Sequence, residues 1–161
     1  MSTTATPLRI GDAAPTLRLP ATPEGTIDAA DYRGRYVVLY FYPKDNTPGC
    51  TLESNDFNAL IDDFAALNAQ ILGVSRDSQR SHCNFANKFS FRFPLLADSD
   101  EQLCLAFDVM RDKTMYGKKV RGIERSTFLI DPEGKIAALW RKVKVEGHAA
   151  EVLARLRGLH R

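Results

Sequence analysis

The chain has 161 residues, 44% of them hydrophobic, and we expect residues 1–161 to form a single domain with an apolar core. Its 22 basic and 20 acidic residues leave a net charge of +2, which argues against a nucleic-acid-binding protein or one held to an anionic membrane. No apolar run reaches the roughly 18 residues of a membrane span, and residues 1–15 lack the pattern of a secretory signal. We therefore expect a cytoplasmic protein, with residues 1–7 frayed.

The first half of the chain predicts alternating strands and helices. Residues 17–19 give a weak strand signal before a turn at 20–25, and the β-branched and aromatic run 36–42 predicts a buried central strand. A loop at 43–49 precedes a helix whose apolar face carries Phe57, Leu60, Ile61 and Phe64. A strand at 70–75, a helix at 78–89 capped by Asp77 or Ser78, a strand at 93–97 and a short helix at 101–107 follow.

The second half predicts a hairpin and a final helix. Strands at 126–130 and 135–140 flank a turn at 131–134, and residues 149–156 form an amphipathic helix. The basic run at 118–121 is interpreted as a solvated loop in preference to a binding patch. This order of elements predicts an α/β domain with a central mixed β-sheet and helices on both faces, typical of a thioredoxin-like fold.

Cys50 follows the buried strand and the loop, at the start of a helix. Thr47 precedes a proline, which favours the extended backbone of an N-cap, and Pro48 suits the first helical position. Cys50 is then in the first helical turn, where unpaired N–H groups and the helix dipole favour a thiolate. Gly49 leaves room for a small ligand to approach the backbone. A small apolar cysteine packed under the helix is the alternative from position alone.

Residues 41–53 carry the pattern P-x-x-x-T-x-x-C, here Pro43, Thr47 and Cys50, and the chain resembles the peroxiredoxins of the Q type in this segment. Segments at 73–77, 93–98, 116–119 and 122–131 resemble the same branch in the same order, so the resemblance covers nearly the whole chain. It implies a thiol peroxidase that acts on hydrogen peroxide and organic hydroperoxides, without haem, flavin or metal. It also implies a monomer.

The resemblance assigns roles to five residues. Cys50 attacks the peroxide and becomes a sulfenic acid, while Arg125, the Thr47 hydroxyl and the Cys50 N–H stabilise the leaving oxygen. Pro43 shields the sulfur from water. Glu53 either orients Arg125 through a charge-assisted bond or is solvated. Tyr42 is interpreted as an aromatic core residue.

The sequence departs from this branch at its second cysteine. Asn55 and Ala86 stand where Q-type sequences carry a resolving cysteine, and the nearest cysteine is Cys83. Cys83 lies off the apolar stripe of its helix, so we expect a partly exposed thiol that pairs with Cys50 after local unwinding. Thioredoxin would then reduce the disulfide. The alternative is a one-cysteine cycle, in which an external thiol such as glutathione or glutaredoxin resolves Cys50.

The remaining cysteine and the histidines receive structural interpretations. Cys104 lies among apolar residues and is expected to pack. His82 is expected to be solvated, in preference to a role in tuning the neighbouring Cys83 thiol. His82, His148 and His160 are not at ligand spacing, so no metal site is predicted. A thiol–disulfide oxidoreductase would need a C-x-x-C motif, which 47–50 lacks. A non-catalytic redox sensor remains as a further alternative.

Overall fold

The computed structural model describes residues 8–160, so the predicted fraying of residues 1–7 lies outside the described part of the chain. Its elements in chain order are β1 (Leu19–Pro20), β2 (Thr26–Ile27), the 3₁₀ helix η1 (Ala29–Tyr32), β3 (Tyr36–Phe41), α1 (Pro48–Ala59), α2 (Ile61–Ala66), β4 (Ala69–Ser75), α3 (Gln79–Phe89), β5 (Leu95–Ala97), α4 (Gln102–Ala106), β6 (Met110–Met115), β7 (Lys118–Ile123), β8 (Ser126–Ile130), β9 (Ile136–Trp140) and α5 (His148–Leu159). Among these described residues, no helix is both long enough and apolar enough to cross a membrane.

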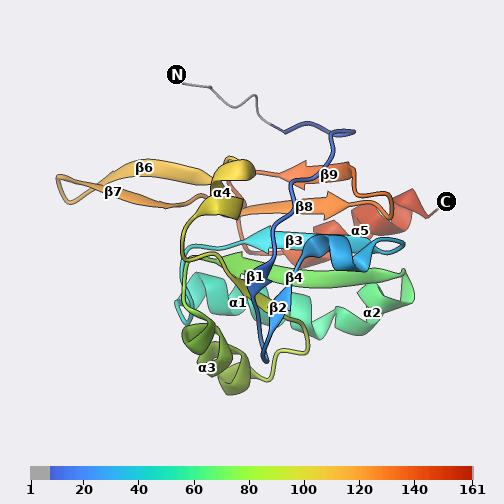
Figure 1. Ribbon diagram of the computed structural model, residues 1–161, viewed down its shortest axis with the longest axis horizontal. Helices are drawn as coiled ribbons and strands as arrows, with labels where there is room; N and C mark the ends of the chain where they lie inside the picture. The colour runs from blue at the N-terminus through green and yellow to red at the C-terminus, as the bar shows by residue number, and fades with distance from the viewer. Residues whose placement is uncertain (1–7, 161) are drawn as a thin grey trace.

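A five-stranded mixed sheet forms the centre of the molecule, in the order β5-β4-β3-β8-β9 (Figure 1). β3, β4 and β5 run parallel to one another, while β8 runs antiparallel to both β3 and β9. The parallel pairs are joined by crossovers that contain helices, and the antiparallel pair β8–β9 is joined by a tight turn. The predicted mixed sheet is confirmed.

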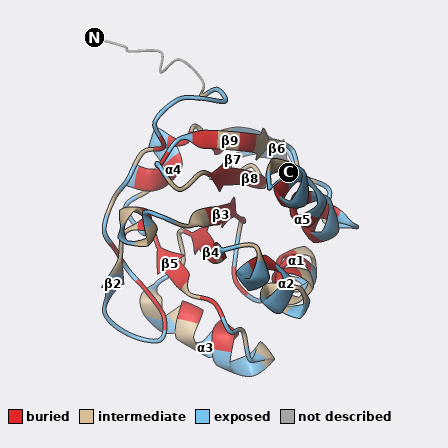
Figure 2. Ribbon diagram, turned by 90° about the vertical axis from the view of Figure 1, so that its right-hand side faces the viewer, coloured by how far each residue is buried: buried red, intermediate tan, exposed pale blue. Residues whose placement is uncertain are grey.

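The central strand β3 alternates its side chains between two hydrophobic cores. Val37, Leu39 and Phe41 belong to the core beneath α4, whereas Val38 and Tyr40 belong to the core beneath α1, α2 and α5. Figure 2 shows buried residues concentrated in the sheet, with helices on both of its faces. Because β3 is covered on both sides, its sequence is almost continuously apolar.

The predicted helix containing Phe57 and Phe64 is broken in two at Leu60, whose φ of −100° and ψ of 8° leave the helical region. Both phenylalanines are nevertheless fully buried. The apolar spacing therefore identified the buried face correctly, but it did not reveal the change of helix axis. The predicted strand at 93–97 begins two residues later, at Leu95.

The interpretation of residues 118–121 as a loop is wrong, because they belong to β7, which pairs with β6 as a separate antiparallel hairpin. The hairpin projects from one end of the molecule (Figure 1). Most of its side chains are exposed, so no alternation of apolar and polar residues marks these strands in the sequence.

Tyr40 fixes α1 to the sheet. Its hydroxyl shares a hydrogen bond of 2.7 Å with that of Ser54, and its ring lies over Gly73 in the neighbouring strand. A Cβ atom at Gly73 would lie 2.9 Å from the tyrosine ring, so only glycine leaves room for this packing. The helix that carries Cys50 is thereby held against the carboxyl-terminal part of β3.

Candidate active site

Cys50 occupies the third position of α1, directly after Pro48 and Gly49. Thr47 is at the predicted N-cap position, with the extended backbone that such a residue requires (φ −94°, ψ 156°). Its side chain does not cap the helix, since the hydroxyl instead donates to the Lys44 carbonyl at 3.0 Å. Cys50 therefore lies in the first turn of the helix, where backbone N–H groups have no partner within the helix.

Arg125 lies against the Cys50 sulfur. Its Nη2 donates to Sγ at 3.4 Å, although the two residues are 75 positions apart in sequence. Cys50 is only 1% exposed, so this contact is sheltered from water. Burial lowers the pKa of Arg125, but the negative charges of Glu53 and Cys50 outweigh burial, and the net pKa is raised. The guanidinium therefore remains a cation beside the sulfur.

Glu53 holds the other end of the guanidinium. Its Oε1 accepts a hydrogen bond of 2.7 Å from Arg125 Nη1, while its Oε2 has no hydrogen-bond partner among the described residues. The side chain is fully buried. Burial raises the pKa of Glu53 to about 7, against the opposing effect of the Arg125 charge. Of the two alternatives for Glu53, the solvated side chain is wrong, and the charge-assisted bond to Arg125 is present.

Gly49 provides space for the guanidinium. A Cβ atom at this position would lie 3.3 Å from Arg125 Nη2, closer than ordinary van der Waals contact. The sequence suggested that Gly49 admits a ligand, and the structure shows that the approaching group is a side chain of the protein itself. Pro43 is half-buried and lines a groove of about 410 Å³ together with Lys44, Arg76, Asp77 and Ser99.

A buried polar cluster joins the loop before Cys50 to α3. His82 is fully buried, contrary to the prediction of a solvated side chain. Its Nδ1 lies 2.7 Å from Asp45 Oδ2, and its Nε2 lies 2.9 Å from the Leu96 carbonyl. The same carboxyl group accepts hydrogen bonds from the hydroxyls of Tyr42 and Ser81. Tyr42 is buried as predicted, but its hydroxyl makes it part of this cluster.

Asp45, Asp77 and His82 offer oxygen and nitrogen atoms that lie within 4.8 Å of one another. These atoms are engaged by donors of the protein: Asp77 Oδ2 accepts from the Asp45 N–H and the Ser75 hydroxyl, and Asp45 is bonded to His82. The three side chains therefore connect the ends of β3 and β4 with α3.

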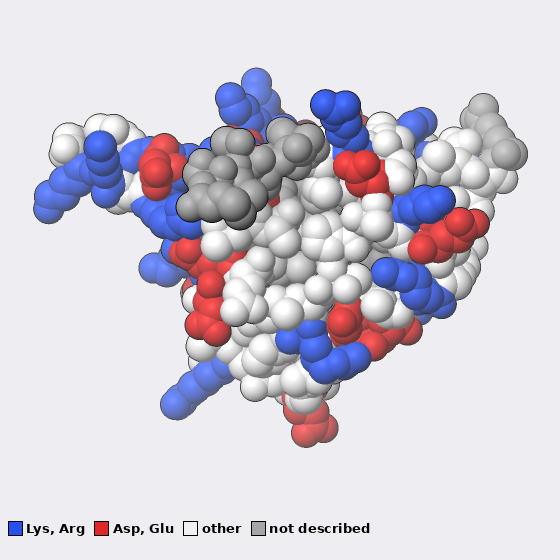
Figure 3. All heavy atoms as spheres, turned by 45° about the horizontal axis from the view of Figure 1, so that its top comes forward, with Lys and Arg blue, Asp and Glu red and all other residues white. Residues whose placement is uncertain are grey.

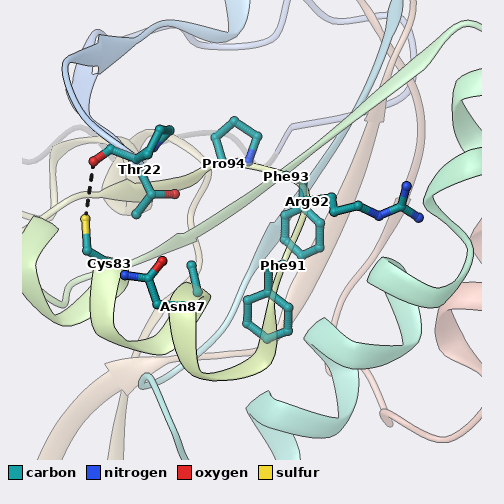
Figure 4. A pocket seen from close by; sticks show the side chains of 9 residues that line it. Thr22, Cys83, Asn87, Phe91, Arg92, Phe93 and Pro94 are labelled. Atoms are coloured by element: carbon teal, nitrogen blue, oxygen red, sulfur yellow. Dashed lines mark hydrogen bonds between the residues drawn. The ribbon is translucent and has the colours of Figure 1, made fainter.

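Cys83 is half-buried on the side of α3 that faces Pro23. Its Sγ lies 3.5 Å from the Pro23 carbonyl and lines a cavity of about 310 Å³ with Asn87, Phe91 and Phe93 (Figure 4). Ser81, His82 and Lys88 of α3 form side-chain hydrogen bonds with the loop before Cys50. Cys83 is a partly exposed thiol, as predicted, and it is turned toward the cavity.

Cys104 is fully buried and belongs to the core beneath α4, which confirms the predicted packing role. Burial, together with the nearby Asp98 carboxyl group, raises the pKa of its thiol far above the usual range. All three cysteines are unpaired, and among the described residues only Cys50 has a cationic hydrogen-bond partner. This arrangement suits a sulfur nucleophile whose negative charge is stabilised at a helix N-terminus.

Comparisons with known proteins identify the relatives of this chain. Residues 10–139 match the model of the AhpC/TSA family. The peroxiredoxin Bcp of Xanthomonas campestris is 61% identical over 126 residues, which are 78% of this chain and 79% of that protein. The peroxiredoxin Bcp of Bacillus subtilis is 50% identical over 152 residues, covering 94% of this chain and 97% of its own.

Solved structures give the same result for the fold. A structure of the Xanthomonas campestris bacterioferritin comigratory protein, determined in a study of its alkyl peroxide reduction activity, superposes with a TM-score of 0.86 and 54% identity. The match covers 90% of this chain and 92% of that one. The predicted thioredoxin-like architecture is thereby confirmed. Family, relatives and structure together show that the chain belongs to the AhpC/TSA family as a peroxiredoxin of the Bcp/PrxQ type, a thiol-dependent oxidoreductase that acts on peroxides.

Proposed function

We propose that Cys50 is the sulfur that reacts with peroxide. The observation that carries this proposal is the 3.4 Å contact between Arg125 Nη2 and Cys50 Sγ in the first turn of α1. A thiolate there is stabilised by a guanidinium and by unpaired backbone N–H groups, in a site that excludes most water. Neither Cys83 nor Cys104 has a comparable cation among the hydrogen-bond partners found in the described residues.

The reaction follows from these positions. The Cys50 thiolate attacks one oxygen of the hydroperoxide, the O–O bond breaks, and the other oxygen leaves with the electron pair and takes up a proton to become water or an alcohol. The sulfur is oxidised to a sulfenic acid. Arg125 and the Cys50 N–H stabilise the negative charge on the leaving oxygen.

Thr47, Pro43, Gly49 and Glu53 position these groups. Because the Thr47 hydroxyl hydrogen is directed to the Lys44 carbonyl, its oxygen is available to accept a hydrogen bond from a hydroperoxide O–H. Glu53 holds Arg125 through Nη1 and leaves Nη2 for the sulfur. Gly49 makes room for the guanidinium, and Pro43, without an N–H, shields the sulfur.

The substrate class we propose is hydrogen peroxide and small organic hydroperoxides. Support for the organic class comes from the alkyl peroxide reduction activity of the Xanthomonas campestris relative. The near-complete burial of Cys50 favours small or extended peroxides that can reach a recessed sulfur. The reaction needs no metal or organic cofactor, since the sulfur itself is oxidised and reduced.

For the recycling step, we propose that the Cys83 thiol attacks the sulfenic acid to give a disulfide and water, and that thioredoxin reduces the disulfide. Cys83 and Cys50 are both unpaired, and the Cys83 thiol faces Pro23 rather than the loop before Cys50. Formation of the bond therefore requires α3 or the start of α1 to open, because disulfide Cα atoms lie within about 7 Å of each other.

The orientation of Cys83 also favours a second candidate, a one-cysteine cycle in which an external thiol reduces the Cys50 sulfenic acid directly. In that case Cys83 would remain a free thiol after one equivalent of peroxide. We propose a single-domain monomer acting in the cytoplasm in either case.

Three variants test the proposal in one peroxide-consumption assay. Cys50→Ser should abolish turnover with dithiothreitol as reductant, whereas Cys104→Ser should retain it. Cys83→Ser should retain turnover with dithiothreitol and lose it with thioredoxin. Equal losses in Cys50→Ser and Cys104→Ser would refute the assignment, and full thioredoxin-dependent turnover by Cys83→Ser would favour the one-cysteine cycle.

A further inference from the structure

The β6–β7 hairpin stands apart from the rest of the fold. Its two strands pair only with each other and project beyond the end of the central sheet (Figure 1). Tyr116 at the tip is 99% exposed and has a positive φ of 52°, a backbone conformation that costs free energy for a bulky residue. Val120 is also exposed. A two-stranded ribbon contributes little to stability, so its own packing does not account for this projection.

The hairpin concentrates positive charge. Residues 110–123 contain five basic side chains and one acidic side chain, a net charge of +4, in a chain whose total is +2. The rest of the chain therefore has 17 basic against 19 acidic residues and a net charge of −2. Figure 3 shows the basic side chains gathered at the projecting end of the molecule.

Three of the five basic side chains form no salt bridge within the described part of the chain. Arg111 pairs with Glu124 at 3.5 Å, and Arg121 pairs with Glu101 at 3.1 Å, so both are tied to the body of the protein. Lys113, Lys118 and Lys119 are exposed, and none forms a salt bridge with a described carboxylate. These lysines, the free lysines of the hairpin, are available to a partner.

The base of the hairpin is connected to the site. Arg76 donates from Nη2 to the Arg121 carbonyl at 3.2 Å and from Nη1 to Glu101 at 2.9 Å. Arg76 also lines the groove that contains Pro43 of the loop before Cys50. Arg125, the partner of Cys50, follows the last residue of β7 after a single residue. A macromolecule that approaches this loop therefore meets the hairpin as well.

We propose that the β6–β7 hairpin is a docking arm for the protein that reduces the oxidised enzyme, and that this partner presents acidic side chains around its reactive thiol. The inference rests on the proposed function. The reductant supplies two thiols, which become one disulfide, and the two electrons and two protons released restore the protein disulfide to two thiols. Opposite charges steer such an encounter and increase its rate.

A polyanion such as duplex DNA is a less favoured binding partner for the β6–β7 hairpin. The excess negative charge outside the hairpin repels an extended polyanion, whereas a protein thiol needs to contact only the hairpin and the adjoining groove. A thiol reductant must also bind near the site in every catalytic cycle. A docking arm beside the site would increase the rate of that binding.

The register of the hairpin separates its two faces. Lys113 pairs with Val120, and Lys118 lies on the same face, whereas Lys119 pairs with Thr114 on the opposite face. The face with Lys113 and Lys118 combines two cations with an exposed apolar side chain. We expect single Lys→Glu changes on this face to weaken docking more than Lys119→Glu does.

The test compares two reductants, thioredoxin and dithiothreitol, at several salt concentrations. Lys113→Glu/Lys118→Glu, on the face that carries Val120, should lower kcat/KM for thioredoxin by about tenfold at low salt and flatten its salt dependence. Turnover with dithiothreitol should be unchanged, because dithiothreitol needs no docking arm. Arg155→Glu/Arg157→Glu, a change of equal charge on exposed residues of α5, is the matched control and should leave both reductants unaffected.

Several results would overturn the proposal. An unchanged kcat/KM for thioredoxin in the hairpin variant, or equal losses in the hairpin and α5 variants, would show that the hairpin does not dock the reductant. A parallel loss with dithiothreitol would assign the hairpin to the integrity of the site. Duplex DNA binding that is lost in the variant while thioredoxin kinetics stay the same would identify a polyanion as the occupant. Failure of the proposed function itself would appear separately, as dithiothreitol-dependent turnover by Cys50→Ser.

Discussion

Arg125 uses two nitrogens for two different acids, Nη1 for Glu53 and Nη2 for the Cys50 sulfur. A lysine has one ammonium group and cannot reproduce this fork. We expect Arg125→Lys to lower the second-order rate of Cys50 oxidation by about 10²-fold, the effect of removing one preorganised donor. Stopped-flow measurement with hydrogen peroxide checks this. Arg18→Lys, in an exposed ion pair with Asp31, should react at the wild-type rate, and an unimpaired Arg125→Lys would contradict the role of the fork.

Gly49 provides a finer test of the same contact. Gly49→Ala would place a methyl group 3.3 Å from Arg125 Nη2, so the guanidinium must shift by a few tenths of an ångström. We expect peroxide oxidation to slow by roughly tenfold, as catalytic geometry is sensitive to small displacements. Gly158→Ala in α5 is the control, because its Cβ would meet no atom within 4 Å. Loss of rate in both variants would indicate a general effect of alanine.

Glu53 connects the site to the pH dependence of stability. Burial raises the pKa of its carboxyl group to about 7 from an ordinary 4.5, so the folded state binds this proton more tightly than the unfolded state does. The contribution to the free energy of unfolding is therefore fully present below pH 4.5 and is lost as pH rises through 7. His148 acts in the opposite direction. Burial lowers its pKa from 6.5, so its contribution to the free energy of unfolding increases as pH rises.

Glu53→Gln should remove the decrease in stability that Glu53 causes as pH rises. Between pH 5 and pH 7, the free energy of unfolding of the wild type should fall relative to that of the variant, by at most about 1.4 kcal/mol per pH unit. Urea unfolding at several pH values measures both slopes. Identical slopes in the two proteins would show that Glu53 titrates alike in the folded and unfolded states.

At the scale of elements, the link between α3 and the loop before Cys50 depends on a buried pair. The Leu96 carbonyl can only accept, so His82 Nε2 carries a hydrogen, and Nδ1 lies 2.7 Å from Asp45 Oδ2. His82→Leu would leave the buried Asp45 carboxyl group without its main partner, and we expect the free energy of unfolding to fall by about 3–5 kcal/mol.

The exposed pair of Arg92 and Asp62 is the control for this prediction. Its side chains are 58% and 84% exposed, so Asp62→Ala should change the free energy of unfolding by no more than about 1 kcal/mol. Urea unfolding at pH 7 compares the two variants. Similar losses in both would show that the buried pair contributes no more than a surface pair.

Elements with a clear capping residue or a continuous apolar run were the most predictable from sequence. Ser78 caps α3 as expected, with its side chain accepting from the Ser81 N–H at 3.1 Å, and β8 has the predicted bounds. The β6–β7 hairpin escaped prediction because its residues are exposed on both faces and give no period of 2. The burial of His82 escaped because its partner, Asp45, is 37 positions away, on another element.

At the scale of the whole molecule, the site lies where distant segments meet. The local pattern of Thr47, Pro48 and Cys50 predicted a sulfur at a helix start, whereas the contact with Arg125 spans 75 positions and came only through the resemblance to a family. Composition and spacing alone did not distinguish a reactive Cys50 from a cysteine that packs under the helix. The mixed sheet brings the start of α1 and the start of β8 together, because β3 and β8 are neighbours.

The central claim is that the sulfur held by Arg125 is the one that peroxide oxidises. Its most direct test is to add one equivalent of hydrogen peroxide to the reduced Cys83→Ser variant in the presence of dimedone, which traps sulfenic acids, and to map the adduct by mass spectrometry. We predict a single adduct on Cys50, formed much more slowly when Arg125→Lys is also present. An adduct on Cys104, or equal labelling with and without the Arg125 guanidinium, would contradict the account.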